Sequence, residues 1–268
     1  MDKGLILIAY GHDNYLRMAT NLVNSLKVNA PDLKVCLLTD KQVEKGLFDK
    51  IVKISAKDFK ISPLELKSKL NKYTPFKHTI YLDVDMIATM HRSITELFDM
   101  QGEFTIQNMG EAVQNHWADV ELLKKTYKVE HLTAIFSECF VWKQGELADE
   151  IFKKWQSHFH TIKVEYKKFN GYVPDELPLM IALAELKIYP TKWIPIYWRG
   201  HGREFVNLSM SAISQRFLCY SIGGNQNDDK MKVQYDLLSK HFASVTGVKL
   251  PYYTFKSKKT WNNLRTSC

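Results

Sequence analysis

The stretch HTIYLDVDMIA, residues 78–88, is the most informative part of the chain because it joins an apolar run to two carboxylates. Residues 79–82 have the β-branched, aromatic and aliphatic character of a buried strand. Such a strand does not tolerate carboxylates unless something neutralises them, and Asp83 and Asp85 close this one. Side chains two residues apart on an extended segment point to the same face, so the sequence predicts that both carboxylates reach one ligand.

A hard divalent cation is the ligand that this pair of carboxylates favours. Mg²⁺ and Mn²⁺ take oxygen donors and also bridge to phosphates. The alternative is a pair of loop or helix-capping aspartates at a strand exit, because an isolated D-x-D is common by chance. The position directly after a strong strand favours the metal-binding interpretation.

The composition limits the class of protein. A chain of 268 residues with 45% hydrophobic residues is long enough for a sizeable core. No stretch reaches the roughly 18 apolar residues of a membrane-spanning helix, and the start of the chain lacks the pattern of a secretory signal. The four cysteines are scattered without CxxC pairing. We therefore expect buried thiols in a reducing cytoplasm, bacterial or viral-host in type.

The net charge of +8 suits nucleic acid, an anionic membrane or a phosphate-bearing substrate. No arginine-rich helix face or stacking-aromatic motif is present in the sequence, so no specific nucleic acid is expected as a partner. The strongest basic cluster is the C-terminal tail, residues 249–268, where lysines alternate with aromatic residues. This mixture suits peripheral contact with the inner membrane face, the alternative being a tail that packs along the domain or is disordered.

The first hundred residues alternate strand and helix. Strands are expected at residues 5–10, 34–39 and 51–54, and helices from Asp13, as the capping residue, and over residues 63–73. This alternation predicts an α/β fold with a mostly parallel sheet, whose ligands bind at the carboxyl ends of the strands. Tyr10, Asp40 and the D-x-D pair all fall at such ends, which indicates one common site.

After residue 104 the chain carries longer helices and more aromatic residues. Helices are expected at residues 117–127, 145–159 and 174–186, and an apolar strand at residues 135–142. Nothing resembles an interdomain linker or an internal repeat. The sequence therefore predicts that the second half is built onto the first within one domain.

Two segments carry a resemblance to a known family: ILIAYGHDNYLRMATNLVNSL at residues 6–26 and KSKLNKYTPFKHTIYLDVDMIA at residues 67–88. They resemble the nucleotide-sugar-binding half of GT-A glycosyltransferases, and most of all the glycogenin-like and lipooligosaccharide-galactosyltransferase-like group, glycosyltransferase family 8. The match is best over residues 5–100. It implies a single GT-A domain over residues 1–248, with a nucleotide-binding half up to residue 100 and a sugar and acceptor half after it.

The resemblance implies a site for a nucleotide sugar. Its residues would be Ala9, Tyr10, Gly11, Tyr15, Asp40, Lys67, Asp83, Val84, Asp85, Gly223 and Gly224. Tyr15 would lie against the base, and the D-x-D pair would hold Mn²⁺ or Mg²⁺, which stabilises the diphosphate as it leaves. The alternatives are an ordinary first-turn aromatic for Tyr15, a plain turn residue for Asp40 and a solvated helix lysine for Lys67.

The second half would supply the catalytic residues, for which the resemblance implies Asp175, Glu176 and Glu138. The segment FSEC at residues 136–139 falls where the family shows F-N-x-G, with Ser and Cys in place of Asn and Gly. Glu138 lies inside an apolar strand and needs a hydroxyl or cation partner. Asp175 and Glu176 match an acidic pair beside the anomeric carbon or the acceptor hydroxyl, although Asp175 also suits a helix N-terminus.

The largest departure from the family concerns its third metal ligand. The family commonly places a histidine in an H-x-x-G-x-x-K-P-W segment, whereas this chain has CYSIGGNQN at residues 219–227. Cys219 or Tyr220 falls where that histidine would be. His201 in WRGHGRE is the candidate replacement.

The resemblance implies a metal-dependent transferase that moves a hexose from a UDP-sugar to a hydroxyl of a glycan, a lipid-linked saccharide or a protein, with retention. An inverting relative would instead use Asp175 or Glu176 as a general base. One alternative is a non-catalytic basic binding protein on a degenerate transferase fold. Another is a haloacid-dehalogenase-like phosphatase, but its D-x-D continues with Gly-Thr, whereas Met86 follows here.

Overall fold

The computed structural model describes residues 2–43, 46–89, 92–112, 119–162, 173–189, 197–199, 217–221 and 229–251. Its centre is a six-stranded sheet in the order β3-β2-β1-β4-β7-β6. The strands are β1 (Lys3–Ala9), β2 (Val35–Thr39), β3 (Lys50–Lys53), β4 (His78–Leu82), β6 (Phe104–Glu111) and β7 (Thr133–Lys143). The first four are joined in parallel and the last two are added antiparallel, which confirms the mostly parallel α/β fold.

A second sheet has three short strands in the order β5-β9-β8. These are β5 (Met86–Ala88), β8 (Tyr197–Arg199) and β9 (Cys219–Ser221). The α-helices are α1 (Asp13–Asn29), α2 (Leu70–Tyr73), α3 (Val120–Tyr127), α4 (Glu146–Thr161), α5 (Glu176–Glu185) and α8 (Asp229–Thr246). Three 3-10 helices are η1 (Ala56–Asp58), η2 (Pro63–Lys69) and η3 (Ile94–Asp99).

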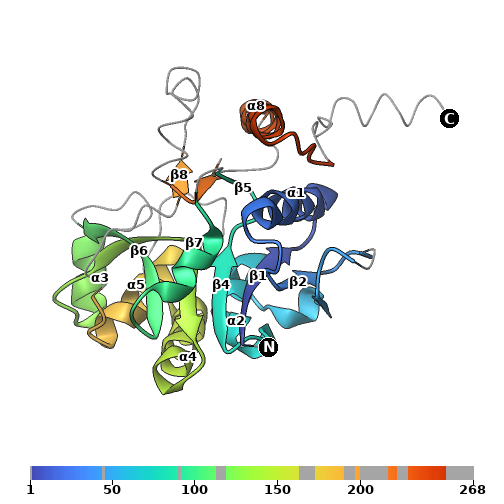
Figure 1. Cartoon of the computed structure of the whole chain (residues 1–268). Coiled ribbons are helices and arrows are strands. Elements are labelled where there is room, and N and C mark those ends of the chain that lie inside the picture. Colours follow the sequence, from blue (N-terminus) through green and yellow to red (C-terminus); the bar gives the residue numbers. More distant parts are fainter. Residues whose placement is uncertain are drawn as a thin grey trace.

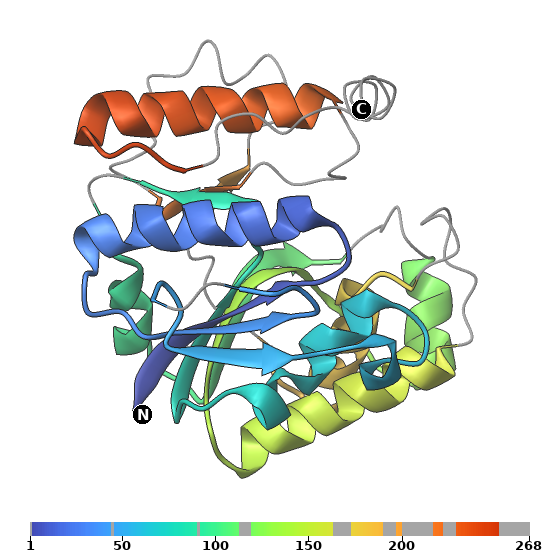
Figure 2. The same cartoon turned by 90° about the vertical axis from the view of Figure 1, so that its right-hand side faces the viewer.

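Helices cover both faces of the central sheet. Figures 1 and 2 show α1, the small sheet and α8 on one side, with α4 and α5 on the other. Side chains of β1 alternate between the two layers, since Leu5 and Leu7 join the core beneath α1 whereas Ile6 joins the core beneath α4 and α5. A strand that is buried on both faces must be apolar throughout, which is why residues 5–9 contain no polar side chain.

The structure can also be compared with what the sequence predicts about the cysteines and about membrane-spanning helices. Cys36, Cys139 and Cys219 are free and buried, as expected. None of the helices in the described ranges is both long and apolar enough to cross a bilayer.

Two local predictions were wrong. The N-terminal capping residue of α1 is His12 rather than Asp13, because the Nδ1 atom of His12 accepts a hydrogen bond of 3.1 Å from the amide of Asn14. The helix expected over residues 63–73 is a 3-10 helix up to Lys69, followed by one α-helical turn. The local sequence pattern suits either kind of helix.

Glu65 anchors η2 to the rest of the fold. Its buried carboxylate accepts hydrogen bonds from the amides of Lys60 (2.8 Å) and Ile61 (3.1 Å), and it lies 2.6 Å from the ammonium of Lys69 and 2.9 Å from the ring of His160. Burial alone would raise the pKa of this carboxyl. The hydrogen bonds outweigh burial and lower the pKa of Glu65 to about 2.

Because the pKa of Glu65 is depressed in the folded state, its contribution to stability is present above its ordinary pKa and is lost as the pH falls toward 2. Glu65→Gln is expected to lower the free energy of unfolding at pH 7 by about 3 kcal/mol and to weaken its dependence on pH below about 5. Urea unfolding across that range measures both. Glu121→Gln, at a side chain that is 80% exposed, is the control, and an equally steep pH dependence in Glu65→Gln would contradict the assignment.

The close approach of Gly4 in β1 to Phe76 excludes any side chain at Gly4. A Cβ atom there would lie 2.4 Å from the buried Phe76 ring. Gly4→Ala is therefore expected to lower the free energy of unfolding by about 1–3 kcal/mol, measured in urea. Gly145→Ala is the matched control, since its Cβ would lie 3.4 Å from the movable Glu103 side chain. Equal losses in the two variants would refute the steric account.

Candidate functional site

The carboxyl ends of β1 and β2 meet as the sequence predicts. Ala9 is the buried last residue of β1, and Tyr10 and Gly11 follow it. The amide of Gly11 donates a hydrogen bond of 3.1 Å to Oδ1 of Asp40, the residue after β2. Gly11 has a φ of +89°, a backbone conformation that side-chain-bearing residues rarely adopt. Asp40 therefore fixes the conformation of the loop after β1.

Two aromatic side chains lie at this edge of the sheet. Tyr10 is half-buried and packs edge-to-face against Phe59, with ring centroids 5.2 Å apart. Tyr15, in the first turn of α1, is also half-buried. Burial and the negative charges of Asp85 and Asp83 raise the pKa of Tyr15, so its phenol lies close to the D-x-D segment.

Asp83 and Asp85 lie in a turn between β4 and β5, not on an extended strand. The same-face argument from strand geometry therefore does not apply to them. Their negative charges both act to raise the pKa of Tyr15, after the larger effect of its burial. Val84 between them is buried, and both aspartates remain partly exposed. The amide of Asp83 donates a hydrogen bond of 2.8 Å to the carbonyl of Glu138 in β7, which fixes the turn against the sheet.

Lys67 is the centre of a buried ionic cluster. Its ammonium nitrogen lies 2.9 Å from Oδ1 of Asp83 and 2.8 Å from Oδ2 of Asp175. It also lies 5.3 Å from the centre of the Tyr81 ring, and the Tyr81 hydroxyl donates to Asp83. Lys67 is only 6% exposed, so the alternative of a solvated helix lysine is wrong. The cluster joins η2, the end of β4 and the segment before α5.

Asp175 is held as an anion by Lys67 and by the hydroxyl of Ser137 in β7, which donates to Oδ2 of Asp175. The indole of Trp155 in α4 donates at 3.0 Å to the main-chain carbonyl of Asp175, so it positions the residue without stabilising its charge. Burial raises a carboxyl pKa, but the charge and hydrogen bond of Lys67 outweigh it and lower the pKa of Asp175. Burial lowers a lysine pKa, but Asp175 and Asp83 outweigh it and raise the pKa of Lys67.

Glu138 has the hydroxyl partner that a buried carboxylate requires. The Ser221 hydroxyl donates to Oε2 of Glu138 at 2.9 Å, and both residues are buried. This bond joins β7 of the central sheet to β9 of the small sheet. The sequence predicted a partner of this kind, and the structure confirms it.

Glu176 begins α5 and is partly exposed. Burial of its carboxyl has the largest effect, the negative charges of Asp175 and Glu138 act in the same direction, and Lys67 and the amide of Glu176 itself oppose them. Together they raise the pKa of Glu176 to about 8. The three carboxylic residues expected to be catalytic, Asp175, Glu176 and Glu138, therefore lie in one region, next to the D-x-D turn.

Several expected site residues lie outside the described residues: His201, Gly223, Gly224 and the tail beyond residue 251. Within the described ranges, no three His, Cys, Asp or Glu side chains form a group that holds a metal ion. A metal at Asp83 and Asp85 therefore remains a prediction.

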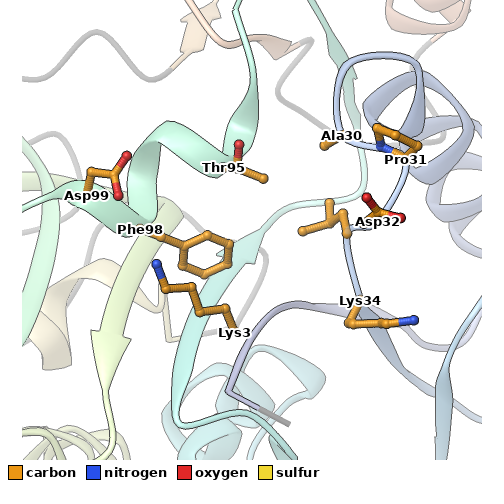
Figure 3. Close-up of a pocket in the computed structure, with 9 residues that line it drawn as sticks. Lys3, Ala30, Pro31, Asp32, Lys34, Thr95, Phe98 and Asp99 are labelled. Carbon is orange, nitrogen blue, oxygen red and sulfur yellow. The ribbon is translucent and has the colours of Figure 1, made fainter.

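A surface hollow of about 410 Å³ lies elsewhere. It is lined by the start of β1, the loop between α1 and β2, and η3, including Lys3, Asp32 and Phe98 (Figure 3). These elements lie at the amino end of β1, whereas the carboxylate cluster follows the carboxyl end of β4. The hollow therefore does not belong to the candidate site.

The chain has the GT-A fold, as its sheet order and its likeness to two solved glycosyltransferase structures show. The chain is similar to the apo structure of WbbM, a bifunctional glycosyltransferase, with a TM-score of 0.59 and 12% identity over 90% of this chain and 50% of that one. It thus spans about half of WbbM's length. It is also similar to galactosyltransferase LgtC in complex with donor and acceptor sugar analogues, with a TM-score of 0.54 and 13% identity over 98% of this chain and 99% of that one. No protein-family model and no curated protein sequence matches the chain.

Sequence reasoning missed four contributors to the site: Phe59, Tyr81, Ser137 and Ser221. Ser137 and Ser221 carry a signal, because a hydroxyl inside an apolar strand must find a hydrogen-bond partner. Tyr81 was assigned only to the strand, although its polar tip also needs a partner when it is buried. Phe59 gives no signal, since nothing local links it to Tyr10.

Lys67→Met is expected to lower the free energy of unfolding by about 3–5 kcal/mol, because it leaves the buried Asp175 carboxylate without a cation. Adding Asp175→Asn should restore part of that loss, since the remaining side chain is then neutral. Urea unfolding at pH 7 is the measurement. Lys34→Met, at an ion pair whose lysine side chain is 55% exposed, should cost less than about 1 kcal/mol. A loss equally small in Lys67→Met would contradict the burial argument.

Proposed function

We propose that the protein is a metal-dependent glycosyltransferase that moves a hexose from a UDP-sugar to a hydroxyl of a glycan, a lipid-linked saccharide or a protein. The observation that carries the proposal is the ionic cluster of Lys67, Asp83 and Asp175 beside the D-x-D turn. It lies at the carboxyl edge of a sheet with the GT-A strand order, where open α/β folds bind their ligands. Both similar structures are glycosyltransferases.

The chemistry of the cluster suits a sugar. Buried ion pairs bring little net stability because both charges lose their hydration, so a cluster that reaches a partly exposed edge suggests a functional site. Carboxylates accept hydrogen bonds from sugar hydroxyls, and ammonium groups donate to them. Asp83 is partly exposed and already fixed by Lys67, so it offers a rigid acceptor to a bound nucleotide sugar.

The D-x-D turn suits a divalent cation. Asp83 and Asp85 are partly exposed and supply the oxygen donors that Mn²⁺ and Mg²⁺ prefer. We propose His201 as a further ligand. The bound cation would screen the negative charge of the departing diphosphate.

The residues at the ends of β1 and β2 would bind the nucleotide. The main chain of Ala9, Tyr10 and Gly11 would line the pocket, in a conformation that the hydrogen bond from Gly11 to Asp40 fixes. Tyr15 would lie against the base, in reach of the D-x-D turn that holds the diphosphate. We propose transfer with retention, in which the departing phosphate accepts the proton of the acceptor hydroxyl.

The location proposed for the enzyme is the cytoplasm, with peripheral contact at the inner membrane face. Lysines and aromatic residues alternate in the tail at residues 249–268, a composition that binds anionic lipid surfaces. This contact would bring the enzyme to a lipid-linked acceptor.

A UDP-release assay across a panel of UDP-sugars tests the proposal, with Mn²⁺, with Mg²⁺ and with a chelator. One donor is expected to be cleaved in a metal-dependent way, and Asp85→Asn should slow that cleavage by at least about 100-fold. Asp32→Asn, in the hollow away from the site, is the control for a surface aspartate. No UDP release, together with no metal-dependent UDP binding in calorimetry, would favour a non-catalytic binding protein.

A further inference from the structure

Tyr81 is a buried residue of β4 whose side chain reaches the D-x-D turn. It is 2% exposed, and its hydroxyl donates a hydrogen bond to Oδ1 of Asp83, two residues further along the chain. A buried phenol needs a hydrogen-bond partner, so this bond has one of two roles. Either it only satisfies the hydroxyl of Tyr81, or it also positions Asp83 for a ligand.

The sheet, rather than Asp83, fixes the position of the Tyr81 hydroxyl. The main chain of Tyr81 is paired on both sides, with Ile6 of β1 and with Phe140 of β7. Its ring packs against the ring of Phe140, with centroids 4.9 Å apart, inside the core beneath α4 and α5. A tyrosine has only two side-chain torsions, so a ring that is packed in this way holds its hydroxyl in one place. Asp83 therefore meets a rigid donor.

Lys67 alone does not fix the orientation of the Asp83 carboxylate. Its ammonium nitrogen lies 2.9 Å from Oδ1 and 3.1 Å from Oδ2 of Asp83, so it hardly distinguishes the two oxygens. It also binds Asp175, at 2.8 Å. An ammonium group is a compact charge with rotatable donors, whereas the Tyr81 hydroxyl donates to Oδ1. Tyr81 therefore determines which oxygen of Asp83 faces the interior.

These contacts leave one oxygen of Asp83 for a ligand. A carboxylate has about four lone-pair sites, shared between its two oxygens. Tyr81 and Lys67 occupy the sites of Oδ1, and Lys67 occupies one site of Oδ2. The two donors are 2% and 6% exposed, whereas the Asp83 side chain is 24% exposed. The remaining site of Oδ2 is therefore the one that a bound ligand can use.

We propose that Tyr81 is a positioning residue of the candidate site, whose hydroxyl holds Oδ1 of Asp83 so that Oδ2 is presented in one orientation to a divalent cation. The inference rests on the proposed metal-dependent transferase function. Tyr81 acts through Asp83 and, being buried, touches neither the cation nor the sugar. Groups that orient a metal ligand in this way contribute to metal affinity without binding the metal.

Tyr81→Phe tests this role because it removes the hydroxyl and keeps the ring. The measurement is the affinity for Mn²⁺ in the presence of UDP, from the electron paramagnetic resonance signal of unbound Mn²⁺, with a protein-free titration subtracted. Tyr81→Phe is expected to raise the Kd of Mn²⁺ by about tenfold, as is typical when a group that orients a metal ligand is removed. Asp85→Asn, which changes a proposed ligand directly, should raise the Kd further.

Tyr73→Phe is the matched control. The hydroxyl of Tyr73 in α2 also donates to an aspartate, Oδ1 of Asp58, at 2.9 Å. That pair joins α2 to η1 and does not involve the D-x-D turn. Tyr73→Phe therefore removes the same kind of hydrogen bond and should leave the Kd of Mn²⁺ unchanged.

The outcomes separate this inference from the proposed function. Mn²⁺ binding by the wild type with an unchanged Kd in Tyr81→Phe would overturn the role of Tyr81 and leave the transferase function intact. Equal losses in Tyr81→Phe and Tyr73→Phe would also overturn it, because a general loosening of the fold would explain both. Absence of Mn²⁺ binding by the wild type with UDP would refute the metal-dependent function, and the role of Tyr81 with it.

Urea unfolding without metal tests the purely structural alternative. If the bond only satisfies the buried hydroxyl, Tyr81→Phe should lower the urea midpoint and leave the affinity for Mn²⁺ as it is. The expected result is weaker Mn²⁺ binding together with a fall in the midpoint no larger than that of Tyr73→Phe. A Tyr81→Phe variant that does not fold would overturn the inference, since the hydroxyl would then be a structural requirement of β4.

Discussion

The contact that the rest of the site depends on is the ammonium of Lys67 between Asp83 and Asp175. A lysine that is 6% exposed is tolerated only where carboxylates compensate its charge, so the three residues fix one another. They come from a 3-10 helix, a strand end and a helix start that lie far apart along the chain. Both halves of the chain therefore supply the site, and the hydrogen bonds of the buried Glu65 carboxylate anchor η2, which carries Lys67.

The same contact explains the electrostatics around it. One lysine cannot compensate every carboxyl group in the cluster, so the surplus negative charge must be met by a proton, by hydroxyl donors or by a bound cation. Ser137 and Ser221 supply such hydroxyl donors, to Asp175 and Glu138. Asp83 and Asp85 are partly exposed at the turn, where a divalent cation would supply further positive charge. The whole chain has a net charge of +8, whereas the candidate site has more acidic than basic groups. This local excess of acidic groups suits the proposed transfer.

The features that could be predicted from the sequence are those that depend on neighbouring residues along the chain. The strand before Asp83 and the alternation of strand and helix are readable, because burial of both faces demands continuous apolar runs. The type of helix at residues 63–69 was not readable, since the local sequence pattern suits either kind of helix. Lys67 was equally ambiguous. Its own neighbourhood suits a solvated lysine, and its contacts with Asp83 and Asp175, both distant along the chain, make it part of the site.

The positions where this chain differs from the family pattern help to decide whether the candidate site still catalyses a transfer. The segment at residues 136–139 has Ser where the family has Asn, and a glutamate follows it. Ser137 supplies a hydroxyl to Asp175, and Glu138 receives one from Ser221 on another strand. A site that decays after losing its activity would be expected to leave a buried charge or hydroxyl unpaired, at a cost in stability of about 1–3 kcal/mol for each group. At residues 136–139, Ser137 and Glu138 both have a hydrogen-bond partner across the site, which is the pattern expected of an altered but working transferase.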